Sequence, residues 1–175
     1  MVYWLGSPPS RALQGRSSVS NYKKGEKTMS AKQNKELVRQ AWKAWNEVGG
    51  DAAKVPAVYD KYYTSDFIFH NLAGVDMTRA KQMQSDIELV SAFPDSSYQI
   101  DDILAEGDRV AIRVTMNGIH RGTFMGIPPT GKHVVGKGEE IYRVTGGKIA
   151  ESWCIIDAHG LLNQLGAIPS AGAKR

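Results

Sequence analysis

The sequence predicts a single α+β domain in which a strongly curved antiparallel sheet folds over N-terminal helices. Two observations support this prediction. Apolar residues recur at helical spacing in three segments between residues 30 and 92, whereas from residue 98 onward they alternate with polar residues, as in strands. Helices followed by a run of strands are typical of α+β architecture, and a half-closed sheet of this kind leaves a cavity at its open end. The chain has 175 residues, which suits one domain.

The first predicted helix has clear signals at both ends. Ser30 and Gln33 match a capping box, and Gly49 and Gly50 end the helical pattern. Between these positions, apolar side chains recur along one face of the helix. They are Leu37, Val38, Ala41, Trp42, Trp45 and Val48. We therefore expect an amphipathic helix whose two tryptophans belong to the core.

Two shorter helices and one brief strand are expected next. The second helix covers residues 56–62, with Pro56 in its first turn, where proline is tolerated. Residues 67–70 are predicted to form a brief strand. Thr78 is a candidate N-cap of the third helix, which is expected to end before Phe93 and Pro94.

Four longer strands are predicted in the second half of the chain, at residues 98–105, 109–120, 133–144 and 148–156. Gly146 and Gly147 predict a tight hairpin between the last two strands. The segment from Gly126 to Gly131 contains two prolines and lacks the glycine spacing and the following helix of a nucleotide-binding loop. We interpret it as a rigid turn at a pocket rim or an interface.

The two ends of the chain differ in composition from the predicted domain. Residues 1–28 are rich in Ser, Gly, Pro and Lys and show no apolar periodicity, so we expect a disordered extension, a single domain at 29–170 and a short tail at 171–175. Residues 23–29 would be encoded by purine-rich codons that resemble a bacterial ribosome-binding site before a start codon. We therefore hypothesise that the native chain begins at Met29, the alternatives being an engineered extension or a transit peptide.

Charge and composition argue against several classes of partner. Residues 1–29 hold five basic side chains and one acidic side chain, whereas the remainder holds 17 of each sign, so the net charge of +4 is confined to the extension. A neutral domain offers no electrostatic footprint for nucleic acid, and no apolar run is long enough to span a bilayer. The single cysteine, Cys154, excludes an internal disulfide and is expected to be a small buried hydrophobe rather than a nucleophile. We expect a cytoplasmic protein without nucleic-acid or membrane partners.

Asp157 is the leading candidate for a functional carboxylate. Strand alternation would place it on one face with Ile149, Glu151, Trp153 and Ile155. Apolar surroundings would raise the pKa of its carboxyl group toward the range that is useful for proton transfer. Alternatively, Asp157 caps the helix that follows it, and the two roles are compatible.

Several stretches of the chain match one known family in their order and spacing. They are Ala92 to Asp95, Glu106 to Val110, Gly118 to Lys132, Gly147 to Asp157, and Leu161 to Gly166. Through these stretches the chain resembles the SnoaL-like polyketide cyclases of the nuclear transport factor two-like superfamily. The resemblance covers nearly all of residues 31–168. It implies a cone-shaped α+β barrel with an internal pocket, often in a homo-oligomer, here a dimer or a tetramer, that pairs through its sheet.

The resemblance also implies a reaction. In the characterised cyclases, an aspartate at the place of Asp157 acts as general base and acid in an intramolecular aldol condensation, without a metal or another cofactor. This chain is therefore expected to be a lyase or isomerase that acts on a small hydrophobic carbonyl substrate. His70 and His120 fall where family members often carry polar pocket residues, and we expect them to donate hydrogen bonds to the substrate. Each could equally be a hydrogen-bonded core or rim histidine.

Further residues are candidates for substrate binding. They are Trp153, Phe124, Glu139 and Arg143. Glu139 and Arg143 share one face of a predicted strand, and they could instead form a solvated ion pair. The four histidines are scattered along the sequence, so no metal site is expected.

The same fold hosts other functions, and two alternatives stay open. The first is a non-catalytic module that binds a small apolar molecule. The second is another enzyme of the same fold, an isomerase, a dehydratase or an epoxide hydrolase. An epoxide hydrolase would require Arg113 or Arg143 to meet Asp157 and a second acid such as Asp101.

Overall fold

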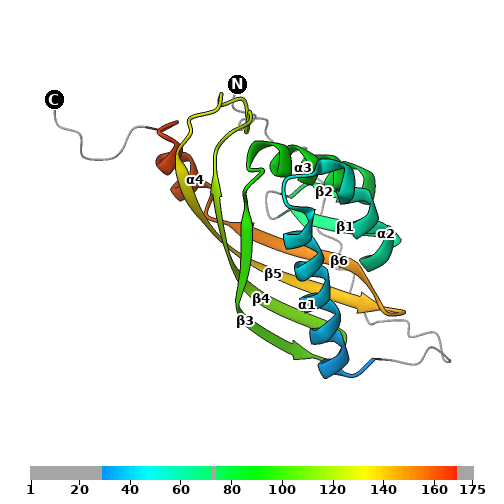
Figure 1. The fold of residues 1–175 in the computed structure, drawn as a ribbon. Helices are drawn as coiled ribbons and strands as arrows, with labels where there is room; N and C mark the ends of the chain where they lie inside the picture. The colour runs from blue at the N-terminus through cyan, green and yellow to red at the C-terminus, as the bar shows by residue number, and fades with distance from the viewer. Residues whose placement is uncertain (1–28, 72–73, 169–175) are drawn as a thin grey trace, which may run out of the picture.

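The structure is a computed structural model that describes residues 29–71 and 74–168 (Figure 1). The predicted extension at 1–28 and the predicted tail at 171–175 lie outside the described residues. The elements follow one another as α1 (Ala31–Val48), η1 (Ala52–Lys54), α2 (Val55–Tyr62), β1 (Tyr63–Asn71), β2 (Asp76–Thr78), α3 (Arg79–Ala92), β3 (Ser97–Glu106), β4 (Arg109–Ile119), β5 (His133–Thr145), β6 (Lys148–Ile156) and α4 (Ala158–Leu165). In these ranges, no helix is long and apolar enough to cross a membrane.

Helix α1 has the predicted boundaries. The backbone N–H of Gln33 donates to Ser30 Oγ at 3.3 Å, and the N–H of Ser30 donates to Gln33 Oε1 at 2.8 Å, which completes the capping box. Gly49 ends the helix in the left-handed conformation, with φ of 55°. Val38, Ala41 and Val48 are buried, so the predicted apolar face does contact the core.

The other short elements differ in detail from the prediction. Helix α2 begins one residue earlier than expected, at Val55, and β1 is longer than the predicted strand at both ends. The short strand β2 was not predicted, because three residues are too few to show alternation. Thr78 does hold the N-cap position of α3, but its side chain makes no capping hydrogen bond.

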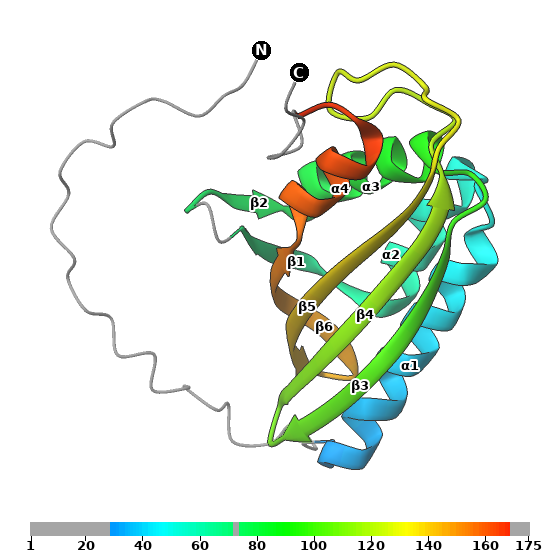
Figure 2. The ribbon, with the colours of Figure 1, turned by 90° about the vertical axis from the view of Figure 1, so that its left-hand side faces the viewer.

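The six strands form one curved, unclosed sheet in the order β2-β1-β6-β5-β4-β3 (Figures 1 and 2). Strands β3 to β6 form the predicted antiparallel meander, and Gly146 and Gly147 join β5 to β6 with positive φ at both residues. Strand β1, however, pairs with β6 in parallel. The sheet is therefore mixed, and the predicted α+β class is confirmed.

Helices α1, α2 and α3 lie on the concave side of the sheet (Figure 2). The main core lies between these helices and the sheet, and Tyr59, Phe67, Tyr142 and Ile149 are almost fully buried in it. The opposite, outer face exposes several large apolar side chains. Leu104 is 72%, Ile141 46% and Ile155 55% exposed.

A β-bulge in β6 changes which side chains share a face. Val144 pairs with Ile149 but Arg143 pairs with Glu151, so one extra residue, Ala150, is accommodated. Ile149 and Ala150 are both buried. The prediction that Ile149 shares a face with Glu151 and Trp153 is therefore wrong, because strict alternation does not hold across a bulge.

Candidate functional site

Two half-buried carboxyl groups, Asp86 of α3 and Glu140 of β5, lie between the helices and the sheet. Asp86 belongs to the helical face that also carries Met83, Ile87 and Val90, which pack into the main core. Glu140 alternates with exposed Glu139 and Ile141, so its side chain points to the concave side of the sheet.

Asp86 is held by two hydrogen bonds. The hydroxyl of Tyr59 donates to Oδ2 at 2.6 Å, and the amide of Gln82, one helical turn earlier, donates to Oδ1 at 3.0 Å. Burial raises the pKa of Asp86 from 3.8 to about 7, although both hydrogen bonds favour the ionised form and oppose this rise. Asp86 is therefore able to exchange a proton near neutral pH.

Glu140 is held by a chain of donors that starts at α1. The indole N–H of Trp42 donates to the Tyr142 hydroxyl at 2.9 Å, and this hydroxyl donates to Glu140 Oε2 at 2.7 Å. An indole can only donate, so the direction of the chain is fixed. Burial raises the pKa of Glu140 from 4.5 to about 7, the negative charge of Asp86 adds to this rise, and the hydrogen bond from Tyr142 opposes it.

Unused hydrogen-bonding capacity lies beside both acids. Among the described residues, Tyr142 gives Oε2 of Glu140 its hydrogen bond, and no hydrogen bond of normal geometry reaches Oε1. The buried hydroxyl of Ser152 favours the ionised form of Glu140, and it forms no hydrogen bond of normal geometry with any group. The buried Oε1 of Gln82 has no partner either. Buried polar groups without partners are rare in proteins, and one of them lies beside each of these two acids.

Cys154 lies on β6 beside the same acids. Burial, and secondarily the negative charge of Glu140, raises the pKa of its thiol well above the ordinary value. A thiol in this environment stays protonated and is a poor nucleophile. This agrees with the prediction that Cys154 is a hydrophobe, although it is half-buried rather than fully buried.

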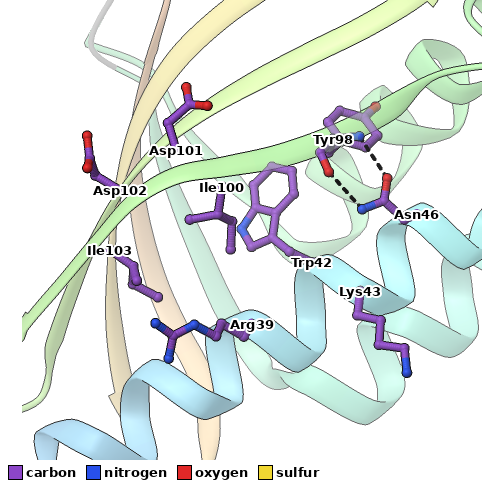
Figure 3. A pocket seen from close by; sticks show the side chains of 9 residues that line it. All are labelled: Arg39, Trp42, Lys43, Asn46, Tyr98, Ile100, Asp101, Asp102 and Ile103. Atoms are coloured by element: carbon purple, nitrogen blue, oxygen red, sulfur yellow. Dashed lines mark hydrogen bonds between the residues drawn. The ribbon is translucent and has the colours of Figure 1, made fainter.

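A groove of about 430 Å³ opens between α1 and β3, next to Trp42 (Figure 3). It is lined by Arg39, Trp42, Lys43 and Asn46 of α1 and by Tyr98, Ile100, Asp101, Asp102 and Ile103 of β3. The rings of Trp42 and Tyr98 meet at 5.4 Å between their centroids. Trp42 therefore belongs both to the wall of the groove and to the donor chain that ends at Glu140.

Asp157 lies elsewhere, on the surface at the start of α4. Its side chain is exposed and accepts a hydrogen bond from the Gly160 N–H at 2.8 Å, which confirms the predicted N-cap. The expected apolar surroundings are absent, because Ile155 and Ile156 are themselves more than half exposed. The proposed catalytic role of Asp157 stays a prediction.

His70, Trp153 and Arg143 gather on the outer face of the sheet. The imidazole of His70 stacks on the Trp153 indole, with ring centroids 4.6 Å apart. Its Nδ1 lies 2.9 Å from Asp76 Oδ1 and its Nε2 lies 3.3 Å from Glu151 Oε2, and Glu151 also forms an ion pair with Arg143. These contacts form a surface network on the far side of the sheet from Glu140.

Phe124 packs against a second, smaller core cluster that includes Phe93, and the ring of His120 lies beside both phenylalanines. His120 is fully buried, its Nδ1 accepts a hydrogen bond from the Thr130 N–H at 3.3 Å, and its ring lies 5.2 Å from that of Phe93. Its Nε2 is buried and has no partner among the described residues. His120 thus fixes the loop between β4 and β5, and the structure does not bring it together with His70 or Asp157.

The arginine and acid relay that an epoxide hydrolase would require is only partly assembled. Arg113 does meet Asp101, with 3.2 Å between Nη1 and Oδ2, and it also pairs with Asp102. Asp157 is not part of this cluster. Among the described residues, no group of three or more His, Cys, Asp or Glu side chains is arranged to hold a metal ion.

The sequence contained a signal for the interior acids that the motif-based reasoning missed. Because Glu139, Ile141 and Arg143 share one strand face, Glu140 and Tyr142 must point to the other face. Asp86 similarly falls within the apolar stripe of the third helix. A polar residue on a predicted core face is more informative than an apolar residue on the surface, and Asp86 and Glu140 are both polar residues of this kind.

The sequence model of the SnoaL-like polyketide cyclases matches residues 35–165, which is most of the chain. The chain belongs to the SnoaL-like polyketide cyclase family. This confirms the predicted resemblance, and the mixed, curved sheet with its helices is the cone fold that the resemblance implied.

Solved structures support the same conclusion. AclR from Streptomyces galilaeus, a proposed hydroxylase, is 31% identical, with a TM-score of 0.70 over 82% of this chain and 87% of AclR. IdmH from Streptomyces antibioticus, a proposed polyketide cyclase, is 26% identical, with a TM-score of 0.63 over 77% of this chain and 99% of IdmH. A proposed SnoaL-like cyclase from Jannaschia sp. CCS1 shares the fold at 20% identity, with a TM-score of 0.69 over 83% of this chain and 100% of the Jannaschia protein. A search of curated protein sequences gives no match.

Proposed function

We propose that this SnoaL-like protein is an enzyme of the lyase or isomerase type that transfers protons on a small hydrophobic carbonyl compound, using its own side chains. The observation that carries the proposal is the pair of interior acids whose pKa values are both raised to about 7. Such values are suited to general acid and base catalysis near neutral pH. The family and the similarity to IdmH, a proposed polyketide cyclase, favour an intramolecular aldol condensation.

Glu140 is the proposed general base. Its open Oε1 takes a proton from a carbon between two carbonyl groups, and the electron pair of the broken C–H bond moves onto a carbonyl oxygen to form an enolate. The enolate carbon attacks the carbon of a further, more distant carbonyl group of the same molecule, whose π electron pair moves onto its oxygen. The new alkoxide then takes the proton back from Glu140. Tyr142 and Trp42 hold the other carboxylate oxygen, so the base is fixed before the substrate arrives.

The neighbouring groups are proposed to stabilise the enolate. Ser152 has an unpaired hydroxyl, and Asp86 in its protonated form is a second donor. Hydrogen bonds to a developing negative charge in a site that excludes water are the largest contribution in many enzymes of this type. A rival assignment makes Asp157 the proton shuttle and His70 and His120 the hydrogen-bond donors. It places the base at the exposed start of α4, and it requires three side chains that lie apart in this structure to meet at the substrate.

Solvent deuterium exchange and ring closure on a panel of β-dicarbonyl esters that carry a further, tethered carbonyl group test the proposal. We expect Glu140→Gln to lower turnover by roughly 10²- to 10⁴-fold and Asp86→Asn to lower it less. The matched control is Glu88→Gln, an exposed carboxylate on α3, which should not change turnover. Full activity of Glu140→Gln would overturn the assignment, and loss of activity in Asp157→Asn alone would establish the rival one.

A non-catalytic binding protein is the second candidate, because the groove beside Trp42 can hold a ligand without either acid. Wild-type protein that binds the panel without exchange or ring closure would establish this function. Because AclR is a proposed hydroxylase, product analysis by mass spectrometry should also look for the gain of one oxygen atom.

A further inference from the structure

The groove between α1 and β3 carries an unpaired positive charge. The Arg39 side chain lines the groove, and its guanidinium group forms no ion pair or hydrogen bond with any described residue. Lys43 lies 3.9 Å from Glu47 in an exposed i,i+4 pair, which is a weak interaction. The helix side of the groove thus presents a guanidinium group that is free to pair with a ligand.

The acids of the strand side do not cancel this charge. Asp102 Oδ2 lies 2.7 Å from Arg113 Nη2, and Asp101 Oδ2 accepts hydrogen bonds from both Arg113 and Thr115. Figure 3 shows both acids projecting from β3 on the side away from α1, whereas Ile100 points toward α1. Arg113 balances one of these two negative charges, and both carboxylates are held on the side away from α1, so the Arg39 guanidinium is the unpaired charge on the helix side of the groove.

The remaining wall is aromatic and firmly held. The rings of Trp42 and Tyr98 are inclined by 58° to each other, and they present apolar surface to the groove. Asn46 ties the helix to the strand beside them, because its amide donates to the Tyr98 carbonyl at 2.9 Å and accepts from the Tyr98 N–H at 2.7 Å (Figure 3). The groove is therefore preformed, with a cation at one end and two rings at the other.

We propose that this groove binds a planar, ring-containing anion, with Arg39 pairing with a carboxylate or a similar acidic group and with Trp42 and Tyr98 contacting the ring. A guanidinium fork suits a carboxylate, and a volume of about 430 Å³ is within the usual range for a small-molecule site. The binding site itself is independent of the proposed function. The further idea that this anion is the substrate rests on the proposed function. In that function, Trp42 lines the groove and also donates to Tyr142, which donates to the proposed base Glu140.

A matched pair of fluorescent probes tests the proposal. 1-Anilinonaphthalene-8-sulfonate is a ring-containing anion, and N-phenyl-1-naphthylamine has the same rings without the charge. We expect Arg39→Gln to weaken binding of the anion by roughly five- to tenfold and to change the binding of the neutral probe by less than about twofold. The control is Lys81→Gln, an exposed cation on α3, which should change neither.

Amide NMR shifts locate the bound anion. We expect perturbations confined to residues 39–46 and 98–103, and perturbations on the outer face around Ile141 would overturn the proposal. Equal binding of the anion by wild type and Arg39→Gln would also overturn it. The groove assignment and the proposed function can be refuted independently of each other, because Glu140→Gln is expected to lose turnover and still bind the anion. An active Glu140→Gln variant would refute the proposed function and leave the groove assignment in place.

Discussion

The pH dependence of stability gives the most direct test of the interior acid Glu140. Its pKa is 4.5 in an ordinary environment and about 7 in the folded protein. The folded state therefore binds this proton more tightly than the unfolded state does. The resulting stabilisation is fully present below about pH 4.5 and is lost as the pH rises through about 7.

The size of this effect follows from the two pKa values. A rise from 4.5 to about 7 corresponds to about 3 kcal/mol of folding free energy between the protonated and the ionised form. Glutamine has the shape of the protonated glutamic acid and does not titrate. The free energy of unfolding of Glu140→Gln should therefore gain about 3 kcal/mol relative to wild type between pH 4 and pH 8.

Urea unfolding at constant ionic strength, followed by circular dichroism at each pH, measures this difference. The control is Glu139→Gln, which changes the exposed neighbour on the same strand and should shift the free energy of unfolding by less than about 0.5 kcal/mol at every pH. A difference between wild type and Glu140→Gln that does not vary with pH would refute the assignment of Glu140 as a buried acid. It would also remove the main support for the proposed catalytic role.

Three further predictions concern other parts of the molecule. Tyr142→Phe removes the hydroxyl that donates to Glu140 at 2.7 Å, so the carboxylate is less stabilised and the pH profile of kcat/KM should move to higher pH by roughly one unit. Asp157→Ala should lower the free energy of unfolding by about 1 kcal/mol, because the Gly160 N–H loses its acceptor, whereas Asp157→Asn should cost less. Thermal unfolding of both variants checks this. We expect wild type to form a dimer or tetramer through the outer face, and Ile141→Lys to give smaller species in analytical ultracentrifugation, because a charge would enter an apolar interface. A monomeric wild type would contradict the last prediction.

Local signals in the sequence were sufficient for much of the fold. The boundaries of α1 follow from Ser30, Gln33 and Gly49, because capping boxes and glycine caps involve only neighbouring residues. The hairpin at Gly146 and Gly147 follows in the same way from residues that accept positive φ. The N-cap role of Asp157 was also predicted from its position before a helix. Such features are determined within a few residues of the chain.

The candidate site could not be predicted in this way, because burial depends on segments that are distant in the sequence. Trp42 and Tyr142, which orient Glu140, are 100 residues apart. The bulge at Ala150 and the parallel pairing of β1 with β6 decide which side chains of β6 face inward, and neither has a local sequence signal. Most helices and strands, and the family, could be predicted from the sequence, whereas the short strand β2 could not. The burial of Asp86 and Glu140 depends on tertiary packing, because the loss of solvent around a side chain is produced by all the elements that pack against it.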